Sequence, residues 1–223
     1  MPPDPAQAGL LALAGLFATA FVTALSGAVV PGPVLAVTIT HAARLGAKAG
    51  PLIMLGHFFL EGSLVAALAL GLGGVLARPE VAGWVGGAGA LILLWMGTGM
   101  LRSLPGLKLD LSPGKATGPV RDGFLLSLAN PYWSLWWVTV GLSLVAMALE
   151  TRPAWLGVTV FYAGHISADV AWYFLLALVV AKGRRFLNDR VYRALVGVCA
   201  IFLLGFGVYF GVFAARQLGG FLA

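Results

Sequence analysis

Long apolar segments are the feature that most constrains how this chain can fold. At least five of them reach the roughly 18–20 residues that a helix needs to cross the hydrocarbon core of a bilayer, and we expect six crossings in all. Charged residues make up only 10% of the 223, whereas soluble domains contain about 25%. The sequence therefore predicts an all-α, polytopic membrane protein rather than one globular core.

Turn signals separate the expected crossings into two groups of three. The six segments cover residues 9–43, 49–77, 81–101, 123–149, 154–181 and 191–215. Between the third and the fourth, the pairs Pro105-Gly106, Pro113-Gly114 and Gly118-Pro119 are typical of turns. They predict a linker over residues 104–120, with one three-helix half before it (1–103) and one after it (121–223).

Residues that interrupt helices lie inside the first and fourth segments. Pro31-Gly32-Pro33 interrupts the first, and Asn130-Pro131 the fourth. Proline lacks a backbone donor and clashes with the preceding turn, and the freed backbone groups must face protein or a water-filled cavity rather than lipid. The first segment is too long for one straight crossing of about 30 Å, so it is either broken at the prolines or projects beyond the membrane. Broken helices of this kind are typical of transport sites.

The basic residues predict the orientation of the helices. Eleven of the fourteen Lys and Arg side chains lie in the first, third and fifth connections. By the positive-inside rule these connections, including the linker, are cytoplasmic, and both termini lie outside the plasma membrane. The eleven are Arg44, Lys48, Arg102, Lys108, Lys115, Arg121, Lys182, Arg184, Arg185, Arg190 and Arg193.

The two halves resemble each other in sequence. Gly56-His57 followed by Glu61 recurs as Gly164-His165 followed by Asp169. Because each half has three crossings, the halves must be inverted relative to each other, a recurrent plan among transporters. We therefore predict two inverted three-helix repeats, each with a broken first helix. Chance similarity between two sequences rich in Leu and Gly is the alternative.

Four ionisable side chains lie well inside the apolar segments, where such groups are costly and are functional candidates. They are His57 and Glu61 in the second segment, and His165 and Asp169 in the fifth. Each acid stands 13 residues from the basic flank of its segment, which is about 20 Å along a helix. The two helix breaks stand about 15 Å along the helix from the basic flanks of their own segments. We therefore expect both acids and both breaks to meet near the middle of the membrane.

Each acid has a histidine four residues before it, on the same helix face. An imidazole beside a carboxylate suits proton exchange near neutral pH. We predict a substrate-binding or proton-coupling site, with two alternatives: the pairs only hold helices together, and Asn130 only caps a half-helix that begins at Pro131. The predicted site comprises Glu61, Asp169, His57, His165, Pro31, Gly32, Pro33, Asn130 and Pro131.

Aromatic side chains follow the second break directly. Tyr132 and Trp133 are candidates for the wall of a substrate cavity, and so is Trp172 in the fifth segment. An interfacial belt of aromatic residues is the alternative for the run after the break. Simple packing explains these side chains equally well.

Several of these elements together resemble the lysine-exporter (LysE/RhtB-type) translocator family over nearly the whole chain. They are Pro31-Gly32-Pro33 at the end of the first apolar run, a basic connection with Arg44 and Lys48, Ala49-Gly50 leading into Leu55-Gly56, and Asn130-Pro131. The resemblance implies a six-helix secondary exporter that moves amino acids or their derivatives outward, driven by the proton gradient. The chain departs from the family pattern at Val34, where many members have Asn or Asp, and at Glu61, where a Gly-Asp pair is commoner.

Export of an amino acid or related small metabolite in antiport with protons is the function we expect. The alternative is export of a divalent metal cation, because imidazoles and carboxylates also bind transition metals. No metalloprotease motif is present, and the lone Cys199 excludes chemistry that needs two thiols, so we expect no catalytic residues. We also expect no cofactor, no resident metal and no nucleic-acid partner. The sequence leaves open whether two copies form a homodimer.

Overall fold

The computed structural model describes residues 5–72, 78–108, 118–183 and 188–222. These residues form helices and short connections, with no strand among them. Six of the described helical stretches are long and apolar enough to cross a membrane. The prediction of an all-α, polytopic membrane protein is therefore confirmed.

The helices follow one another along the chain with two breaks and two widened turns. The π-helical stretches Leu68–Leu72 and Trp137–Gly141 continue α3 and α7, and single 3-10 turns follow α2 and α5. The α-helices are α1 (Pro5–Ala28), α2 (Pro33–Leu45), α3 (Ala49–Ala67), α5 (Pro79–Ser103), α6 (Pro119–Leu128), α7 (Pro131–Trp136), α8 (Leu142–Leu149), α9 (Ala154–Lys182) and α10 (Asp189–Leu222).

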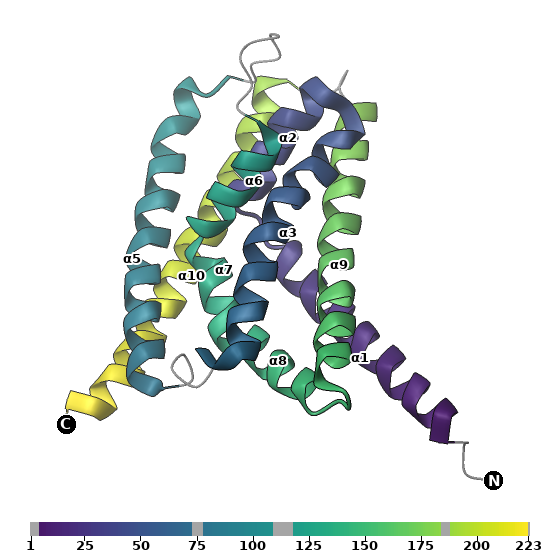
Figure 1. Ribbon diagram of the computed structural model, residues 1–223. Coiled ribbons are helices and arrows are strands. Elements are labelled where there is room, and N and C mark those ends of the chain that lie inside the picture. Colours follow the sequence, from purple (N-terminus) through teal and green to yellow (C-terminus); the bar gives the residue numbers. More distant parts are fainter. Residues whose placement is uncertain (1–4, 73–77, 109–117, 184–187, 223) are drawn as a thin grey trace.

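Three of the connections lie at one end of the bundle, opposite the chain termini (Figure 1). The turns after α2, α5 and α9 are at this end, and both chain termini point to the other. This is the arrangement expected for six crossings, with three connections on one side and two connections and both termini on the other. Among the basic residues assigned to the first end, Lys115, Arg184 and Arg185 lie outside the described residues.

Both predicted breaks are present. The first crossing is divided into α1, which ends at Ala28, and α2, which begins at Pro33 after an extended Gly32 (φ −155°, ψ −171°). In the fourth crossing, α6 ends at Leu128 and α7 begins at Pro131. Of the two alternatives for the long first segment, the helix is broken.

Some predicted boundaries were wrong. The fourth crossing begins at Pro119, inside the expected linker, because a proline at the first position of a helix is compatible with the helical backbone and loses no hydrogen bond there. The last helix extends to Leu222, seven residues beyond its expected end at residue 215. The predicted end of the second segment at residue 77 lies outside the described residues.

Glycine allows α3 and α6 to approach with their backbones in contact. A Cβ atom at Gly123 of α6 would collide with the carbonyl oxygen of Ile53, and one at Gly56 of α3 would collide with that of Val120. Small residues at such crossings are a common device of membrane helix packing. The two helices come from different halves of the chain, so this contact joins the halves.

Substitution of Gly123 by alanine tests this close contact. We expect Gly123→Ala to lower the free energy of unfolding by about 1–3 kcal/mol, the usual cost of overpacking, because the backbone of α3 must move away. The control is Gly99→Ala, since a Cβ there would have no atom within 4 Å. Thermal unfolding of the purified proteins in detergent measures the difference, and equal stabilities of the two variants would contradict the packing.

Candidate functional site

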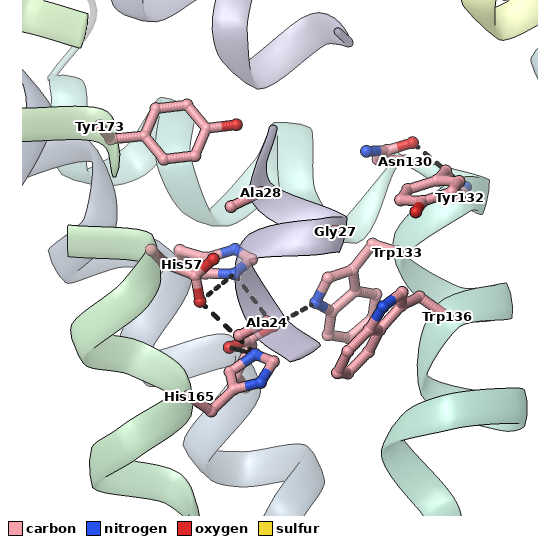
Figure 2. A pocket seen from close by; sticks show the side chains of 12 residues that line it. Ala24, Gly27, Ala28, His57, Asn130, Tyr132, Trp133, Trp136, His165 and Tyr173 are labelled. Atoms are coloured by element: carbon pink, nitrogen blue, oxygen red, sulfur yellow. Dashed lines mark hydrogen bonds and ion pairs between the residues drawn. The ribbon is translucent and has the colours of Figure 1, made fainter. Parts of the chain in front are cut away.

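A small cavity lies between the helix breaks (Figure 2). Its volume is about 60 Å³, room for about four water molecules. Figure 2 shows His57, His165 and Trp133 directed toward its centre. The cavity is lined by Ala24, Gly27, Ala28, His57, Glu61, Asn130, Tyr132, Trp133, Trp136, His165, Asp169 and Tyr173.

Glu61 is the most heavily contacted acid of the site, and only 1% of its surface is exposed. Its Oε1 accepts hydrogen bonds from the indole Nε1 of Trp133 and of Trp137, each at 2.9 Å. His57 Nε2 lies 2.9 Å from the same oxygen. Residues of α3 and of the α7 segment, from different halves of the chain, therefore meet at one carboxylate oxygen.

The second histidine and the second acid complete the cluster from α9. His165 Nε2 lies 3.1 Å from Oε2 of Glu61 and 3.4 Å from Oδ2 of Asp169. His57 Nε2 is 3.9 Å from the same Asp169 oxygen. The four ionisable residues predicted from the sequence thus lie together in one buried group, which is what a membrane interior requires of ionisable side chains.

His57 also connects the cluster to α6. Its Nδ1 lies 2.7 Å from the hydroxyl oxygen of Ser127, which is 1% exposed. Ser127 does not stand out in the sequence, because serine at an apolar helix end is common. Since Gly56 precedes His57 in α3 and packs against α6, the close helix contact brings the histidine within reach of this hydroxyl.

The two helix breaks lie beside each other and beside the cluster. A Cβ atom at Gly32 would be 3.8 Å from Nδ2 of Asn130. Asn130 lines the cavity, and its side chain accepts a hydrogen bond from the backbone N–H of Tyr132 at 3.2 Å. Its capping role is therefore confirmed, while Pro31, Gly32, Pro33 and Pro131 are not among the lining residues.

The aromatic candidates divide into two groups. Tyr132 and Trp133 line the cavity, whereas Trp172 packs beside Ile53 and Met54 in a neighbouring apolar cluster. Trp137 was not selected, although its place four residues after Trp133 puts it on the same helix face. That spacing is the signal that could have identified it.

Apolar clusters close the site at both ends. Along α3, Met54 comes before Glu61 and Val65 after it, and each belongs to a different buried cluster. Along α9, Phe161 and Tyr173 flank Asp169 in the same way. The ionisable group therefore lies between two apolar clusters along both helices.

The cluster contains donors that a metal ion could use. Ligand atoms of His57, Glu61 and Asp169 all lie within 4.8 Å of one another. However, two indole N–H groups donate to Oε1 of Glu61, and an indole nitrogen has no acceptor to offer. A cation at that oxygen would displace both bonds and meet two N–H dipoles, so the donor set fits a bound metal poorly.

A second buried ion pair lies toward the basic end of the bundle. Nε2 of His41 in α2 is 2.9 Å from Oδ2 of Asp122 in α6, and the two residues are 4% and 9% exposed. Sequence analysis did not select this pair, because both residues stand beside arginines (Arg44 and Arg121) and looked like part of the charged flank. The pair joins α2 and α6, the two half-helices that lie between the breaks and the basic end of the bundle.

Replacing one or both members of this pair tests its role in holding α2 and α6 together. We expect His41→Leu and Asp122→Leu each to lower the free energy of unfolding by about 1–3 kcal/mol, because each leaves a buried polar partner behind. The double variant should lose less than the sum of the two single losses. Thermal unfolding of all four proteins measures the coupling, and strictly additive losses would show that the residues do not act as a pair.

Comparison with known proteins identifies a family and a relative. A model of the LysE type translocator family matches residues 25–213 of the chain. A protein of Bacillus subtilis (strain 168) with the name "Putative amino acid efflux protein YcgF" is 27% identical over 208 residues, which are 92% of this chain and 99% of that protein. No solved structure matches the chain.

Proposed function

The chain belongs to the LysE type translocator family, and from this premise we propose that it exports amino acids or related small metabolites in antiport with protons. One observation carries the proposal: two buried acids and two histidines face a cavity between two helix breaks. Ionisable groups at this depth mark ion and substrate pathways. The name of the Bacillus subtilis relative supports amino acids as the substrate class.

The groups around the cavity match the two charged ends of an amino acid. Glu61 and Asp169 would receive the ammonium group, since they are the acids that line the cavity. The side-chain amide of Asn130 and the hydroxyl of Tyr132 could donate hydrogen bonds to the carboxylate. Protons exchanged with the same cluster would compete with the ammonium group, which couples proton entry to substrate exit.

Transport requires the site to open to each side in turn. Its present volume of about 60 Å³ is too small for most amino acids, so substrate can enter only after the apolar clusters separate. The breaks at residues 29–32 and 129–130 are places where half-helices can tilt without breaking further backbone hydrogen bonds. Alternating access around a fixed central site is the usual mechanism of transporters with broken helices.

Transport by purified protein in lipid vesicles tests the proposal. A panel of amino acids is offered with a pH gradient directed as in the cell, and Glu61→Gln and Asp169→Asn are compared with the wild type. We expect each variant to lower proton-driven flux about tenfold to a hundredfold, because each loses a negative charge that a substrate ammonium group would bind through charge-assisted hydrogen bonds worth about 1.5–3 kcal/mol. Glu150→Gln, at an exposed acid after α8, is the control, and intact proton-driven flux in both site variants would refute the mechanism.

Divalent cations are the second candidate substrate, because three ligand atoms lie within 4.8 Å of one another. The same vesicles loaded with a metal-sensitive dye distinguish the two. Cation flux that His57→Ala abolishes, without any amino acid flux, would favour metal export.

We also propose that the protein lies in the plasma membrane with both termini outside. This follows from the basic connections, which the positive-inside rule places in the cytoplasm. Alkaline phosphatase fused after the last residue should be active, and a green fluorescent protein fused there should stay dark. The reverse pattern would show the opposite orientation.

A further inference from the structure

The two acids of the site are close together but have different surroundings. A carboxylate oxygen of Glu61 and one of Asp169 lie within 4.8 Å of each other, and the residues are 1% and 5% exposed. Two buried carboxylates at this separation disfavour the doubly ionised state. The arrangement therefore favours one shared proton, and the hydrogen-bond donors decide which acid holds it.

Glu61 is held as an ion by its donors. An indole N–H can only donate, so Oε1 of Glu61 accepts from both Trp133 and Trp137, while Oε2 is buried and has no hydrogen-bond partner among the described residues. Two N–H donors on one carboxylate oxygen stabilise the ionised form. His57 Nε2 approaches Oε1 at 2.9 Å, and His165 Nε2 lies 3.1 Å from Oε2. Protonation of Glu61 would weaken several charge-assisted contacts together.

Asp169 lacks such support. Its Oδ2 is buried and has no hydrogen-bond partner among the described residues. The nearest basic groups are the two imidazoles, whose Nε2 atoms lie 3.4 Å and 3.9 Å from this oxygen. A buried carboxylate oxygen without a hydrogen-bond partner makes the ionised form costly, whereas the neutral form of Asp169 can donate a hydrogen bond within the cluster.

We propose that the two acids divide the work of the site: Trp133 and Trp137 hold Glu61 as a permanent anionic anchor, and Asp169 takes up and releases the coupled proton. Trp133 and Trp137 are thus positioning residues, which act through Glu61. The assignment of the proton rests on the contacts alone, and its use in transport rests on the proposed function.

The exchange of substrate for a proton then needs no ionisable group other than these two acids. When the ammonium of the substrate arrives between the acids, the O–H bond of Asp169 breaks and its proton leaves to water on that side. When the substrate leaves on the other side, Asp169 takes a proton from water there and the O–H bond forms again. The other titratable groups that line the cavity with Asp169 are His57 and Glu61 of α3, His165 and Tyr173 of α9, and Tyr132 of α7. Tyr162 of α9 also interacts electrostatically with Asp169.

Infrared spectroscopy of the wild-type protein locates the proton without any substrate. Near neutral pH we expect a carbonyl stretch of a protonated carboxylic acid that moves when aspartate carries a heavy carbon isotope in its side-chain carboxyl. The same label in glutamate should leave the band in place, and Asp169→Asn should remove it. A band that moves with the glutamate label, a band that survives Asp169→Asn, or no band at all would overturn the assignment.

Transport measurements then test the division of work, using the amino acid with the largest wild-type flux in the panel above. Asp169→Asn should lose proton-driven accumulation but keep amino acid exchange across the membrane, whereas Glu61→Gln should lose both. Loss of exchange in Asp169→Asn together with retained exchange in Glu61→Gln would refute the division. If the wild type moves no amino acid, the proposed function fails, while the infrared band still decides where the proton lies.

The positioning role of the Trp133 and Trp137 indoles is tested through the KM for amino acid exchange. Trp133→Phe and Trp137→Phe should each raise the KM for exchange roughly tenfold, the effect of one lost charge-assisted bond, with the maximal rate and the proton coupling retained. The control is Trp95→Phe, which removes an indole that is 75% exposed on α5. A fall in maximal rate with unchanged KM would show that the indoles only support the structure.

Discussion

Mutual neutralisation of ionisable side chains in an apolar interior is the constraint on which this structure depends. His57, Glu61, His165 and Asp169 are each at most 9% exposed, so each must find its partner in another helix or along its own. Only a close arrangement of α3, α9 and the α7 segment satisfies them together. The charges therefore fix the relative position of the two halves at the centre of the membrane.

Backbone contacts through glycine set the distances at which these charges meet. Gly56 and Gly123 bring α3 and α6 into direct contact, and a Cβ at Gly164 would collide with the backbone of Phe17, so α9 approaches α1 closely as well. The hydrogen bond between His57 Nδ1 and the Ser127 hydroxyl depends on the first of these contacts. Polar groups in a membrane gain only a modest net energy from each bond, so the small residues are needed to hold the geometry.

Much of the fold could be predicted because it follows from hydropathy and from backbone chemistry. Six apolar lengths and two proline-containing interruptions are local properties, and the spacing of Glu61 and Asp169 from the basic flanks gave their depth. The ion pair of His41 with Asp122 could not be found in this way. Depth along one helix does not show which residues of two separate helices face each other.

The predicted inverted repeat offers a reason why the two acids differ. Gly56 of α3 packs against α6, and Gly164 of α9 packs against α1, so each second helix meets the broken first crossing of the other half. Aligning Pro33 with Pro131 would place Leu35 and Ile39 where the second half has Trp133 and Trp137. Leu35 and Ile39 are apolar and belong to a buried cluster near the basic end, so the first half has no indole donors to offer Asp169. A symmetric plan with one pair of donors replaced would thus leave one acid fixed as an ion and the other free to exchange its proton.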